Sequence, residues 1–545
     1  MKKHKETIFM IMAILCIIIF GTAMAPIELQ NDTFYTIKIG QFIMENGITE
    51  YDPFSWHEAL PYTFPHWLYD VTMAGIYNLG GMFGIYLSTV GLTIALGVIW
   101  FLVNCKLTKN KLSSFILSLA LIYLMAPYIA ARAQLVTFII FVLEIFFIER
   151  FLQNKKIGYA IGLIILPIII ANVHLAVFPF YFVLFLPYLG EYVVAVFADL
   201  PNYIRKFKIH RIDKKLKKGK LSEEKKVAIE QRAEILQQEL VKSQEYTQIR
   251  KNKVYKLKVV KNDNVKLLVI IMIICAFTGF LTPLGDAPYT YLVKTMEGNT
   301  TSNISEHLPL TLINSKPQLC MIVIILALLI FTDTKIRLKD LFMLGGLLLL
   351  ALMSRRQLSM FVLLGMIILN QLIVAFLNKY DKDGCTNFIQ KLQKPIGILS
   401  LLLLVLVMCV PFVKPKMNEK FIPASTYPIA ACDYILENLD IQNIKLYNEY
   451  NFGSYLIYRG IPVFIDSRAD LYTPQFDKEK QRDIFSDFLN ISTLGQYYDE
   501  PFEKYGITHA LIYKNSSLDK LMNRDTAYNL LYEDNNFRLY EKIEV

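Results

Sequence analysis

Eleven long apolar runs constrain the fold of this chain more than any other feature. A backbone surrounded by lipid must satisfy its own hydrogen bonds, so each run predicts a helix. Several runs fall short of the roughly 20 residues that cross a bilayer perpendicularly, which predicts tilted or partly crossing helices. The runs cover residues 7–25, 82–104, 112–126, 135–151, 157–171, 177–198, 267–281, 318–332, 341–353, 358–377 and 396–413. The sequence therefore predicts a polytopic α-helical membrane protein with about 11 spans.

The composition agrees with this class. Hydrophobic residues make up 54% of the 545 residues and charged residues only 19%, with a net charge of +10. Lys and Arg gather in the cytoplasmic loops of multispanning proteins and near anionic headgroups, so membrane lipids explain the positive charge and nucleic acid is not an expected partner. The seven cysteines show no Cys-x-x-Cys or Cys/His spacing, which argues against a zinc site or a disulfide framework.

The start of the chain sets its expected orientation. Residues 1–5 are basic and precede the first apolar run, so the N-terminus is predicted to stay inside while the first helix crosses outward. A competing interpretation is a signal peptide cleaved after Ala23-Met24-Ala25. Both interpretations place Asp32 outside.

If each apolar run crosses the membrane once from this start, all the basic loops fall on one side. The cytoplasmic side receives 106–111, 155–156, 199–264, 335–339 and the lysines between 379 and 394, and the outer side receives 26–67, 127–134, 172–174, 282–316, 354–357 and the region from 414. The expected location is therefore the cytoplasmic (plasma) membrane, with the C-terminal region outside.

Two regions stand apart from the transmembrane domain, residues 1–414. The cytoplasmic insertion 199–264 predicts a charge-rich helical hairpin, which either touches anionic lipid or docks a specific partner. In residues 415–545 the apolar runs shorten to strand length and alternate with helical patterns, which predicts an extracytoplasmic α/β domain. Its expected strands are 444–448, 462–466 and 510–513 and a closing hairpin of 530–533 with 537–542, and its expected helices are 428–439, 453–458, 477–490 and 517–522.

The outer loop 26–67 is the strongest candidate for a catalytic element. Asp32 follows the first run and could act as a general base or a metal ligand, assisted by His57, Glu58 and His66. An ionisable carboxylate next to a membrane span indicates a functional site. The alternative is that Asp32 only caps a juxtamembrane helix over 33–44, and that the two histidines are structural.

Other outer segments carry groups suited to phosphate. Arg132, Arg355 and Arg356 are guanidinium groups at the outer ends of helices, where they can bind a lipid phosphate or anchor the helices as ordinary snorkelling residues. Asn172 and His174 lie where a run meets the same side, as cavity residues or as hydrogen-bonding groups between helices. Glu144 lies within a run and must face the interior.

In the C-terminal domain, a predicted buried strand ends in Asp466, Arg468 and Asp470. Polar groups at the carboxyl edge of an α/β sheet are typical of a substrate cavity. An internal ion pair that fixes the loop is the equal alternative, because no phosphate-binding glycine loop accompanies them.

Several short motifs together resemble the integral-membrane glycosyltransferases of the GT-C superfamily, including protein mannosyltransferases and lipid A aminoarabinose transferases. They are Asp32-Thr33-Phe34-Tyr35 leading to Gly40 and Gly47, Asp52-Pro53-Phe54-Ser55, and His66-Trp67-Leu68. Further segments resemble a branch of bacterial membrane proteins described only as glycosyltransferase-like, over nearly the whole chain. These are Arg132-Ala133-Gln134, Asn172-Val173-His174, Thr282-Pro283-Leu284-Gly285 and the stretch from Phe464 to Tyr472.

The resemblance implies that a carboxylate in the first outer loop binds metal or deprotonates the acceptor, and that the donor is a sugar on a polyprenyl phosphate. Asp32 matches that carboxylate by position. This chain has Asn31-Asp32 where many members have paired acidic residues, and its loop 127–134 has no carboxylate. A divalent metal therefore stays open as a cofactor.

The resemblance thus implies an inverting, polyprenyl-phosphate-sugar-dependent glycosyltransferase that acts on a cell-envelope, lipid or protein acceptor at the outer face of the membrane. The main alternative is a non-catalytic membrane protein that binds or transports lipid-linked saccharides, for which ionisable residues deep in several spans would be expected. A purely structural role of residues 415–545 in the envelope is a third interpretation. The sugar, the acceptor and the oligomeric state stay open.

Overall fold

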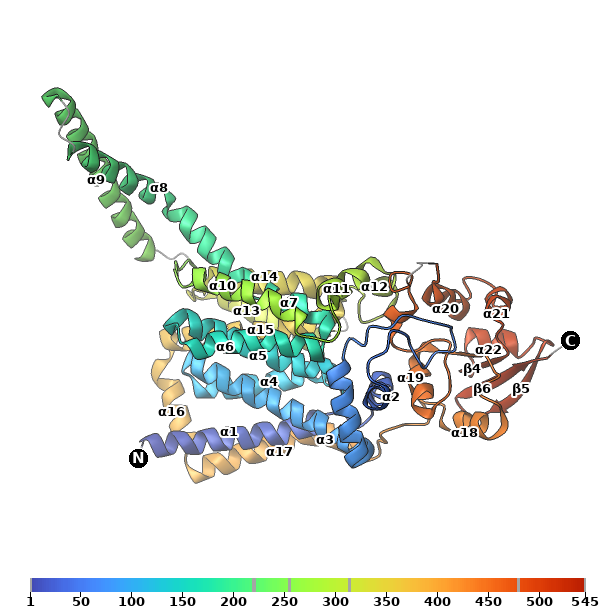
Figure 1. The fold of residues 1–545 in the computed structure, drawn as a ribbon. Coiled ribbons are helices and arrows are strands. Elements are labelled where there is room, and N and C mark those ends of the chain that lie inside the picture. The colour runs from blue at the N-terminus through green and yellow to red at the C-terminus, as the bar shows by residue number, and fades with distance from the viewer. Residues whose placement is uncertain (1, 218–221, 253–255, 312–314, 478–480, 544–545) are drawn as a thin grey trace.

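A bundle of long helices and a smaller α/β unit make up the molecule (Figure 1). The computed structural model describes residues 2–217, 222–252, 256–311, 315–477 and 481–543. In Figure 1 the bundle helices run roughly horizontally, with the N-terminus at one end and the α/β unit at the other. A helical hairpin projects from the end that carries the N-terminus.

Each of the eleven apolar runs is mainly helical, as predicted, although the run 177–198 is divided between two helices by a turn at residues 184–185. The helices of the bundle are α1 (Lys2–Met24), α3 (Trp67–Thr108), α4 (Lys111–Met125), α5 (Ala133–Asn154), α6 (Ile157–Val173), α7 (Phe178–Val183), α8 (Leu186–Leu216), α10 (Val265–Phe277), α13 (Lys316–Phe331), α14 (Leu338–Met353), α15 (Leu358–Tyr380) and α17 (Pro395–Lys416). Within the described ranges, six helical stretches are long and apolar enough to cross a membrane, and three shorter apolar helices accompany them. A helical membrane protein is therefore confirmed, and the count of 11 spans stays a prediction.

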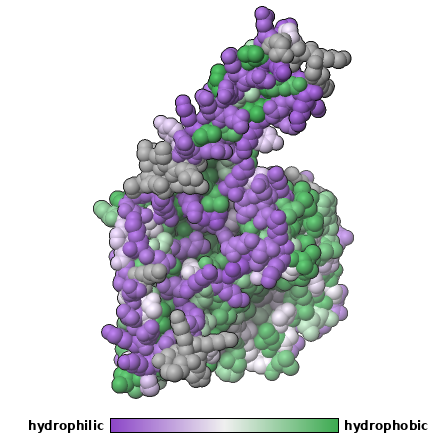
Figure 2. All heavy atoms as spheres, turned by 90° about the vertical axis from the view of Figure 1, so that its left-hand side faces the viewer, coloured by the Kyte–Doolittle hydropathy of each residue, from purple (hydrophilic) through white to green (hydrophobic). Residues whose placement is uncertain are grey.

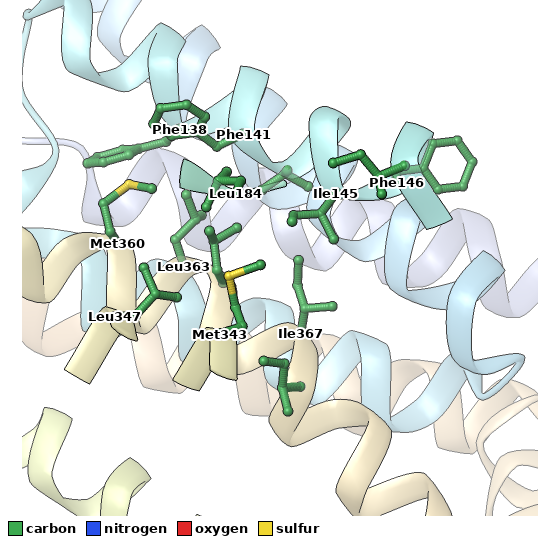
Figure 3. Packing of buried hydrophobic residues seen from close by; sticks show 14 of the residues in the cluster. Phe138, Phe141, Ile145, Phe146, Leu184, Met343, Leu347, Met360, Leu363 and Ile367 are labelled. Carbon is green, nitrogen blue, oxygen red and sulfur yellow. The ribbon is translucent and has the colours of Figure 1, made fainter. Parts of the chain in front are cut away.

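The apolar core of the bundle holds in place the helices whose ends facing the α/β unit carry polar residues. Figure 3 shows Phe138, Phe141 and Ile145 of α5 facing Leu347 of α14 and Met360 of α15. These side chains are buried, and apolar packing of this kind fixes the helices relative to one another. Arg132 directly precedes α5, and Arg355 and Arg356 directly precede α15, so the core also fixes where these arginines lie.

A shorter helix, α2 (Asn31–Asn46), lies across the end of the bundle, between the bundle and the α/β unit (Figure 1). It packs tightly on α3, because an added Cβ at Gly40 would come within 2.0 Å of the carbonyl oxygen of Asp70. On its other side, Phe34 makes edge contacts with Tyr427 and Tyr455 at 4.9 and 5.2 Å. The helix therefore joins the bundle to the C-terminal region.

The C-terminal region contains a four-stranded sheet in the order β3-β4-β6-β5. β3 and β4 are parallel, and β6 is antiparallel to both β4 and β5. The elements are α18 (Ile429–Asn438), β3 (Leu446–Asn448), α19 (Tyr450–Arg459), α20 (Ile484–Thr493), α21 (Asp499–Tyr505), β4 (His509–Tyr513), α22 (Ser517–Met522), β5 (Tyr528–Glu533) and β6 (Phe537–Lys542).

The strand predicted over 462–466 is wrong. This segment forms an isolated parallel bridge, in which Val463 pairs with Ser55 of the loop 26–67. The backbone N–H of Val463 donates to the carbonyl of Phe54, and the N–H of Trp56 donates to the carbonyl of Val463, each at 3.3 Å. A distant loop thus takes up the hydrogen bonds that a neighbouring strand would have made, which local propensity does not reveal.

The helix predicted over 477–490 begins later, at Ile484, and residues 478–480 lie outside the described residues. The remaining elements are the long helix α9 (Glu223–Asn252), the short helices α11 (Ala287–Glu297), α12 (Thr300–Asn303) and α16 (Lys382–Leu392), and the parallel pair β1 (Leu257–Lys258) and β2 (Ile336–Arg337). α11 and α12 lie at the junction of the bundle with the α/β unit (Figure 1).

Candidate functional site

A cavity of about 420 Å³ lies where the bundle meets the α/β unit. Its wall comes from α2, the loop before α3, the first turns of α5 and α15, the segment after α11, and α19 with the loop that follows it. Segments far apart in the sequence therefore converge on one space. Of the residues that the sequence singled out, the cavity brings together Asp32, His66, Arg132, His174, Arg356, Arg468 and Asp470.

Asp32 lies in this cavity in an ion pair with Arg132. Its Oδ2 is 2.9 Å from Nε of Arg132, and the side chains keep 21% and 25% of their exposure. Helix α2 begins at Asn31, and the preceding residue, Gln30, makes no side-chain cap, so Asp32 stands in the first turn. The carboxylate thus faces a charged partner in an open space rather than closing a helix end.

A second carboxylate, Glu306, lies on the other side of Arg132. One guanidinium nitrogen of Arg132, Nη1, is 3.3 Å from Oε1 of Glu306. Burial alone would raise the pKa of Glu306, but Arg132 and Arg356 together hold that pKa below its usual value. Burial would likewise lower the pKa of Arg132, whereas Asp32 and Glu306 raise it above its ordinary value. The arginine is therefore a fixed cation between two carboxylates.

The imidazoles of His66 and His174 form a neutral wall of the cavity. Their rings lie 5.0 Å apart, and Nδ1 of His174 is 2.8 Å from the hydroxyl of Thr137. Burial lowers the pKa of His66 to about 4, and Arg356 and Arg132 act in the same direction. Burial also lowers the pKa of His174, followed by the effects of His66 and Arg356. Near neutral pH both rings can accept or donate a hydrogen bond without carrying charge.

Arg356 and Arg355 begin the 3-10 turn that precedes α15. The loop that carries Glu306 holds this turn, since the N–H of Arg356 donates to the carbonyl of Glu306 at 2.9 Å and the N–H of Arg355 to that of Leu308 at 3.0 Å. Arg356 lines the main cavity, and both arginines line an adjoining cavity of about 210 Å³. Arg132, Gln134, Ser305, Glu306 and Arg356 are common to both cavities. The guanidinium groups thus stand where the two spaces meet.

Asp470 enters the cavity wall from the α/β unit. Its carboxylate accepts hydrogen bonds from the hydroxyls of Tyr291 at 3.1 Å, Thr295 at 2.9 Å and Thr300 at 3.3 Å. These donors belong to α11 and α12, so Asp470 ties the loop after α19 to the segment between α10 and α13. Further tyrosines line the same space, namely Tyr35, Tyr62, Tyr69 and Tyr450.

Asn172 supports the site from outside the cavity. It accepts a hydrogen bond from the indole of Trp67 at 3.2 Å and donates to the carbonyls of Ile168 and Leu281 at 2.8 and 3.0 Å. This is the helix-bridging role that the sequence left open for it.

The structure places His57 and Glu58 away from Asp32. His57 is half-buried against the α/β unit, with Nε2 2.9 Å from the carbonyl oxygen of Phe464, and desolvation there lowers its pKa to about 3. Glu58 is exposed, and its backbone carbonyl accepts a 2.6 Å hydrogen bond from Arg482. The bridge between Ser55 and Val463 lies two residues before His57. Both His57 and Glu58 therefore belong to the part of the loop 26–67 that docks on the α/β unit.

Asp466 and Arg468 form a buried ion cluster with Asp52. Arg468 donates to both carboxylate oxygens of Asp466, at 2.8 and 2.7 Å, and also binds Asp52. The side chains of Asp52 and Asp466 are fully buried and that of Arg468 is 3% exposed. Although atoms of Arg468 reach the cavity wall, its guanidinium is occupied within this cluster. The cluster fixes the loop, as the alternative interpretation predicted.

The donor set of the cavity does not fit a divalent metal. Among the described residues, no group of three or more His, Cys, Asp and Glu side chains gathers closely enough to hold an ion. The two carboxylates that flank the centre of the site, Asp32 and Glu306, both face the guanidinium of Arg132. A positively charged side chain occupies the position between them, where a cation would have to bind.

Sequence reasoning missed Glu306. It treated the segment 282–316 as an outer loop without assigning chemistry to it. The signal was weak but present, because Glu306 and His307 are charged and titratable residues on the same predicted outer side as Asp32.

The architecture has a known counterpart. The chain aligns over its full length with 74% of an archaeal oligosaccharyltransferase, AglB from Archaeoglobus fulgidus, whose structure contains an inhibitory peptide and a dolichol-phosphate; the TM-score is 0.51 and the identity 10%. No protein-family model matches the chain, and no curated protein sequence matches it. At this identity the likeness shows the fold alone, that of a helical membrane protein.

Proposed function

We propose that this protein transfers a sugar from a polyprenyl-phosphate-linked donor to an acceptor of the cell envelope, a lipid or a protein, on the outer face of the cytoplasmic membrane. The observation that carries the proposal is the cavity in which Asp32, Arg132, Glu306 and Arg356 converge at the end of an apolar bundle. A lipid-linked donor needs both an apolar surface for its chain and cations for its phosphate. The fold shared with a protein whose structure holds a dolichol-phosphate agrees with such a donor.

Asp32 acts as the general base in this proposal. It takes the proton of the acceptor while the acceptor atom forms a bond to the anomeric carbon of the sugar. The bond from that carbon to the phosphate oxygen breaks, and its electron pair leaves with the polyprenyl phosphate. Attack opposite the leaving group inverts the anomeric centre. A carboxylate near the reacting carbon also stabilises the positive charge that develops on the sugar ring.

Arg132 and Arg356 bind the phosphate of the donor, and Arg355 extends this cationic surface into the adjoining cavity. Guanidinium groups suit this task because they bind phosphate oxygens in a bidentate manner and stay charged. Their charge stabilises the lipid phosphate as it leaves, and the effect grows in a space that excludes water.

The donor phosphate would compete with Asp32 and Glu306 for Arg132. Both carboxylates pair with that guanidinium in the structure, so binding of the phosphate would loosen the pair and leave the carboxylate of Asp32 to the acceptor. This predicts that the donor binds before the acceptor. No step of the proposal passes through a metal ion.

The α/β unit and the segment after α10 would shape the acceptor side. Tyr291, Tyr450 and Asp470 line the cavity opposite the bundle. Aromatic rings with hydroxyl groups give a flat apolar surface edged by hydrogen-bonding groups. Such a surface suits a sugar ring.

The alternative function, binding or transport of lipid-linked saccharides without chemistry, is favoured by one observation. Glu144 lies in the middle of α5, and both of its carboxylate oxygens are buried with no hydrogen-bond partner among the described residues. A carrier would use such a group. Among the other buried acidic residues of the described bundle helices, Glu149 and Asp340 pair with Lys339, and Glu191 pairs with Arg337. Asp70, in the first turn of α3, resembles Glu144 in that neither of its carboxylate oxygens makes a hydrogen bond within the described residues.

The test compares the lipid-linked sugar pool and the envelope glycans of cells that carry the native protein, Asp32→Asn or Glu28→Gln. Glu28 lies four residues before Asp32, is exposed and does not line the cavity, so it is a matched control. The proposal predicts that Asp32→Asn raises the lipid-linked pool and depletes the glycan, while Glu28→Gln changes neither. Unchanged pools in Asp32→Asn cells would contradict it.

A further inference from the structure

The hairpin of α8 and α9 has no part in the proposed reaction, since it leaves the bundle at the end opposite the cavity (Figure 1). Residues 199–264 contain 19 Lys and Arg against 9 Asp and Glu, a net charge of +10. This equals the net charge of the whole chain, so the rest of the molecule is neutral overall. The net positive charge of the protein therefore comes from residues 199–264.

Ion pairs and backbone contacts tie the base of the hairpin to the bundle. Glu191 of α8 pairs with Arg337 of β2 at 2.6 Å and accepts a hydrogen bond from the N–H of Val260 at 3.2 Å. β1, just after α9, pairs in parallel with β2, and Arg205 of α8 pairs with Glu239 of α9 at 3.0 Å. The hairpin is thus tied both to the bundle and across its own two helices.

The two views of the molecule agree on the direction in which the hairpin extends. Figure 1 shows it sloping away from the bundle at the end that carries the N-terminus. Figure 2, seen from that end, shows it reaching beyond the outline of the bundle. In a membrane crossed by the bundle helices, the area beside that outline is lipid, so the hairpin overhangs the lipid surface rather than the end of the protein.

One face of α8 is suited to this position. Where the helix leaves the bundle, Phe197, Leu200, Tyr203, Ile204 and Phe207 repeat at intervals of three and four residues and are 41–69% exposed. Lys208, Arg211, Lys214 and Lys215 continue on the same side of the helix and are also exposed. An apolar and aromatic stripe followed by lysines is typical of a helix that lies at the boundary of headgroups and acyl chains.

We propose that the α8–α9 hairpin docks on the anionic phospholipids of the leaflet at its own end of the bundle, through this face of α8. The aromatic side chains enter the headgroup region, and the lysines and Arg211 bind lipid phosphates. The inference does not depend on the proposed transferase activity. A polybasic element gains about fivefold in membrane affinity for each basic residue near an anionic surface, and this gain is lost at high salt.

The test uses the full chain in nanodiscs of phosphatidylcholine alone or mixed with phosphatidylglycerol, and measures hydrogen exchange of the backbone amides of 199–216. Docking predicts that phosphatidylglycerol slows exchange at least about fivefold in this stretch, and that high salt reverses the effect. The amides of 358–380 in the buried helix α15 serve as an internal reference that should not change.

A pair of variants of equal charge separates docking through α8 from unspecific attraction. The triple variant K208Q/R211Q/K214Q removes three charges from the proposed face, and K225Q/R232Q/K242Q removes three from α9. The first should abolish the slowing and the second should largely keep it. Equal losses in both variants, or exchange that does not respond to phosphatidylglycerol in the native protein, would overturn the proposal. Slowing by an added acidic protein or by RNA without any response to lipid would likewise contradict it.

Discussion

Two clusters of the same composition lie within this molecule, each an arginine between two carboxylates. In one, Arg132 stands between Asp32 and Glu306, and the three side chains are 21–49% exposed in a cavity. In the other, Arg468 stands between Asp52 and Asp466, and the three side chains are at most 3% exposed. We call them the cavity cluster and the buried cluster.

The difference between the clusters lies in how completely their hydrogen bonds are satisfied. Asp466 also accepts from Tyr472, Asp52 accepts from the N–H of Ser55 at 2.8 Å, and Arg468 lies against the rings of Phe54 and Tyr62 at 5.5 and 4.9 Å. The Nε of Arg132, by contrast, makes no aligned hydrogen bond although Asp32 is near. A satisfied and dry cluster fixes structure, whereas an open one can exchange partners with a ligand.

The largest expected effect on stability comes from breaking the buried cluster. Arg468→Met leaves two buried carboxylates without the cation that balances their charge, which costs about 3–5 kcal/mol. We expect the melting temperature of the purified protein to fall sharply and the loop 26–67 to become open to proteolysis. Arg459→Gln, which removes a partly exposed pair with Asp433, should change stability by less than about 1 kcal/mol. Equal effects of the two variants would show that the buried cluster has no special role.

The cavity cluster should respond in the opposite way. Arg132→Gln is expected to lower the rate of sugar transfer about a hundredfold, because the leaving phosphate loses a cation, while stability changes by about 1 kcal/mol or less. Arg150→Gln, at the far end of α5, is the control and should keep its activity. A drop in stability as large as that of Arg468→Met would place Arg132 among the structural residues.

The pH dependence of stability tests the dry contact between the loop 26–67 and the α/β unit. Burial holds the pKa of His57 at about 3 in the folded protein, below the ordinary value of 6.5, so the unfolded chain binds the proton first. Stability is therefore greatest above pH 6.5 and declines as the pH falls towards 3. At pH 5 the loss from this residue is about 2 kcal/mol.

Melting temperatures at pH 7 and pH 5 measure that loss. His57→Gln keeps a hydrogen-bond donor near the carbonyl of Phe464 but does not titrate, so it should make the decline shallower by the share of His57, while His66 and His174 keep theirs. His210→Gln, an exposed position on α8, should leave the decline as it is. An unaltered pH response in His57→Gln would contradict the assignment.

The smallest expected effect is that of Glu306→Gln. This change removes one of the two carboxylates that compete with the donor phosphate for Arg132. We expect the apparent KM for the donor to fall and kcat to fall about tenfold, because the guanidinium is held less firmly in place. Steady-state kinetics with purified protein measures both. A rise in KM at unchanged kcat would assign Glu306 to donor binding instead.

The sequence predicted the bundle well because apolar runs must become helices in lipid, whatever their partners. It also predicted that Asp32, Arg132 and Arg356 lie on the same side of the membrane, since basic loops mark the cytoplasmic side and the segments between them are expected on the other. The helices α18, α19 and α22 and the hairpin of β5 with β6 followed from short-range patterns, and Ser517–Met522 agrees residue for residue. The sequence placed the start of α20 too early and did not predict α21.

Contacts between distant segments decided what the sequence could not predict. Asp466 and Arg468 were as compatible with a substrate cavity as with an ion pair, because their partner, Asp52, lies more than 400 residues earlier in the chain. His57 looked equivalent to His66, yet one faces the α/β unit and the other the cavity. No role was predicted for Glu306, because its partner, Arg132, lies in a segment far away in the sequence.

The most direct test of the central claim measures transfer and stability together in Asp32→Asn and Asp466→Asn. Each removes one negative charge from the carboxylate of one cluster without changing its shape. The account predicts that Asp32→Asn loses about a thousandfold in the rate of transfer from a polyprenyl-phosphate-linked sugar at an unchanged melting temperature, and that Asp466→Asn mainly loses stability. Full transfer activity in Asp32→Asn, or a melting temperature that falls as far as that of Asp466→Asn, would contradict it.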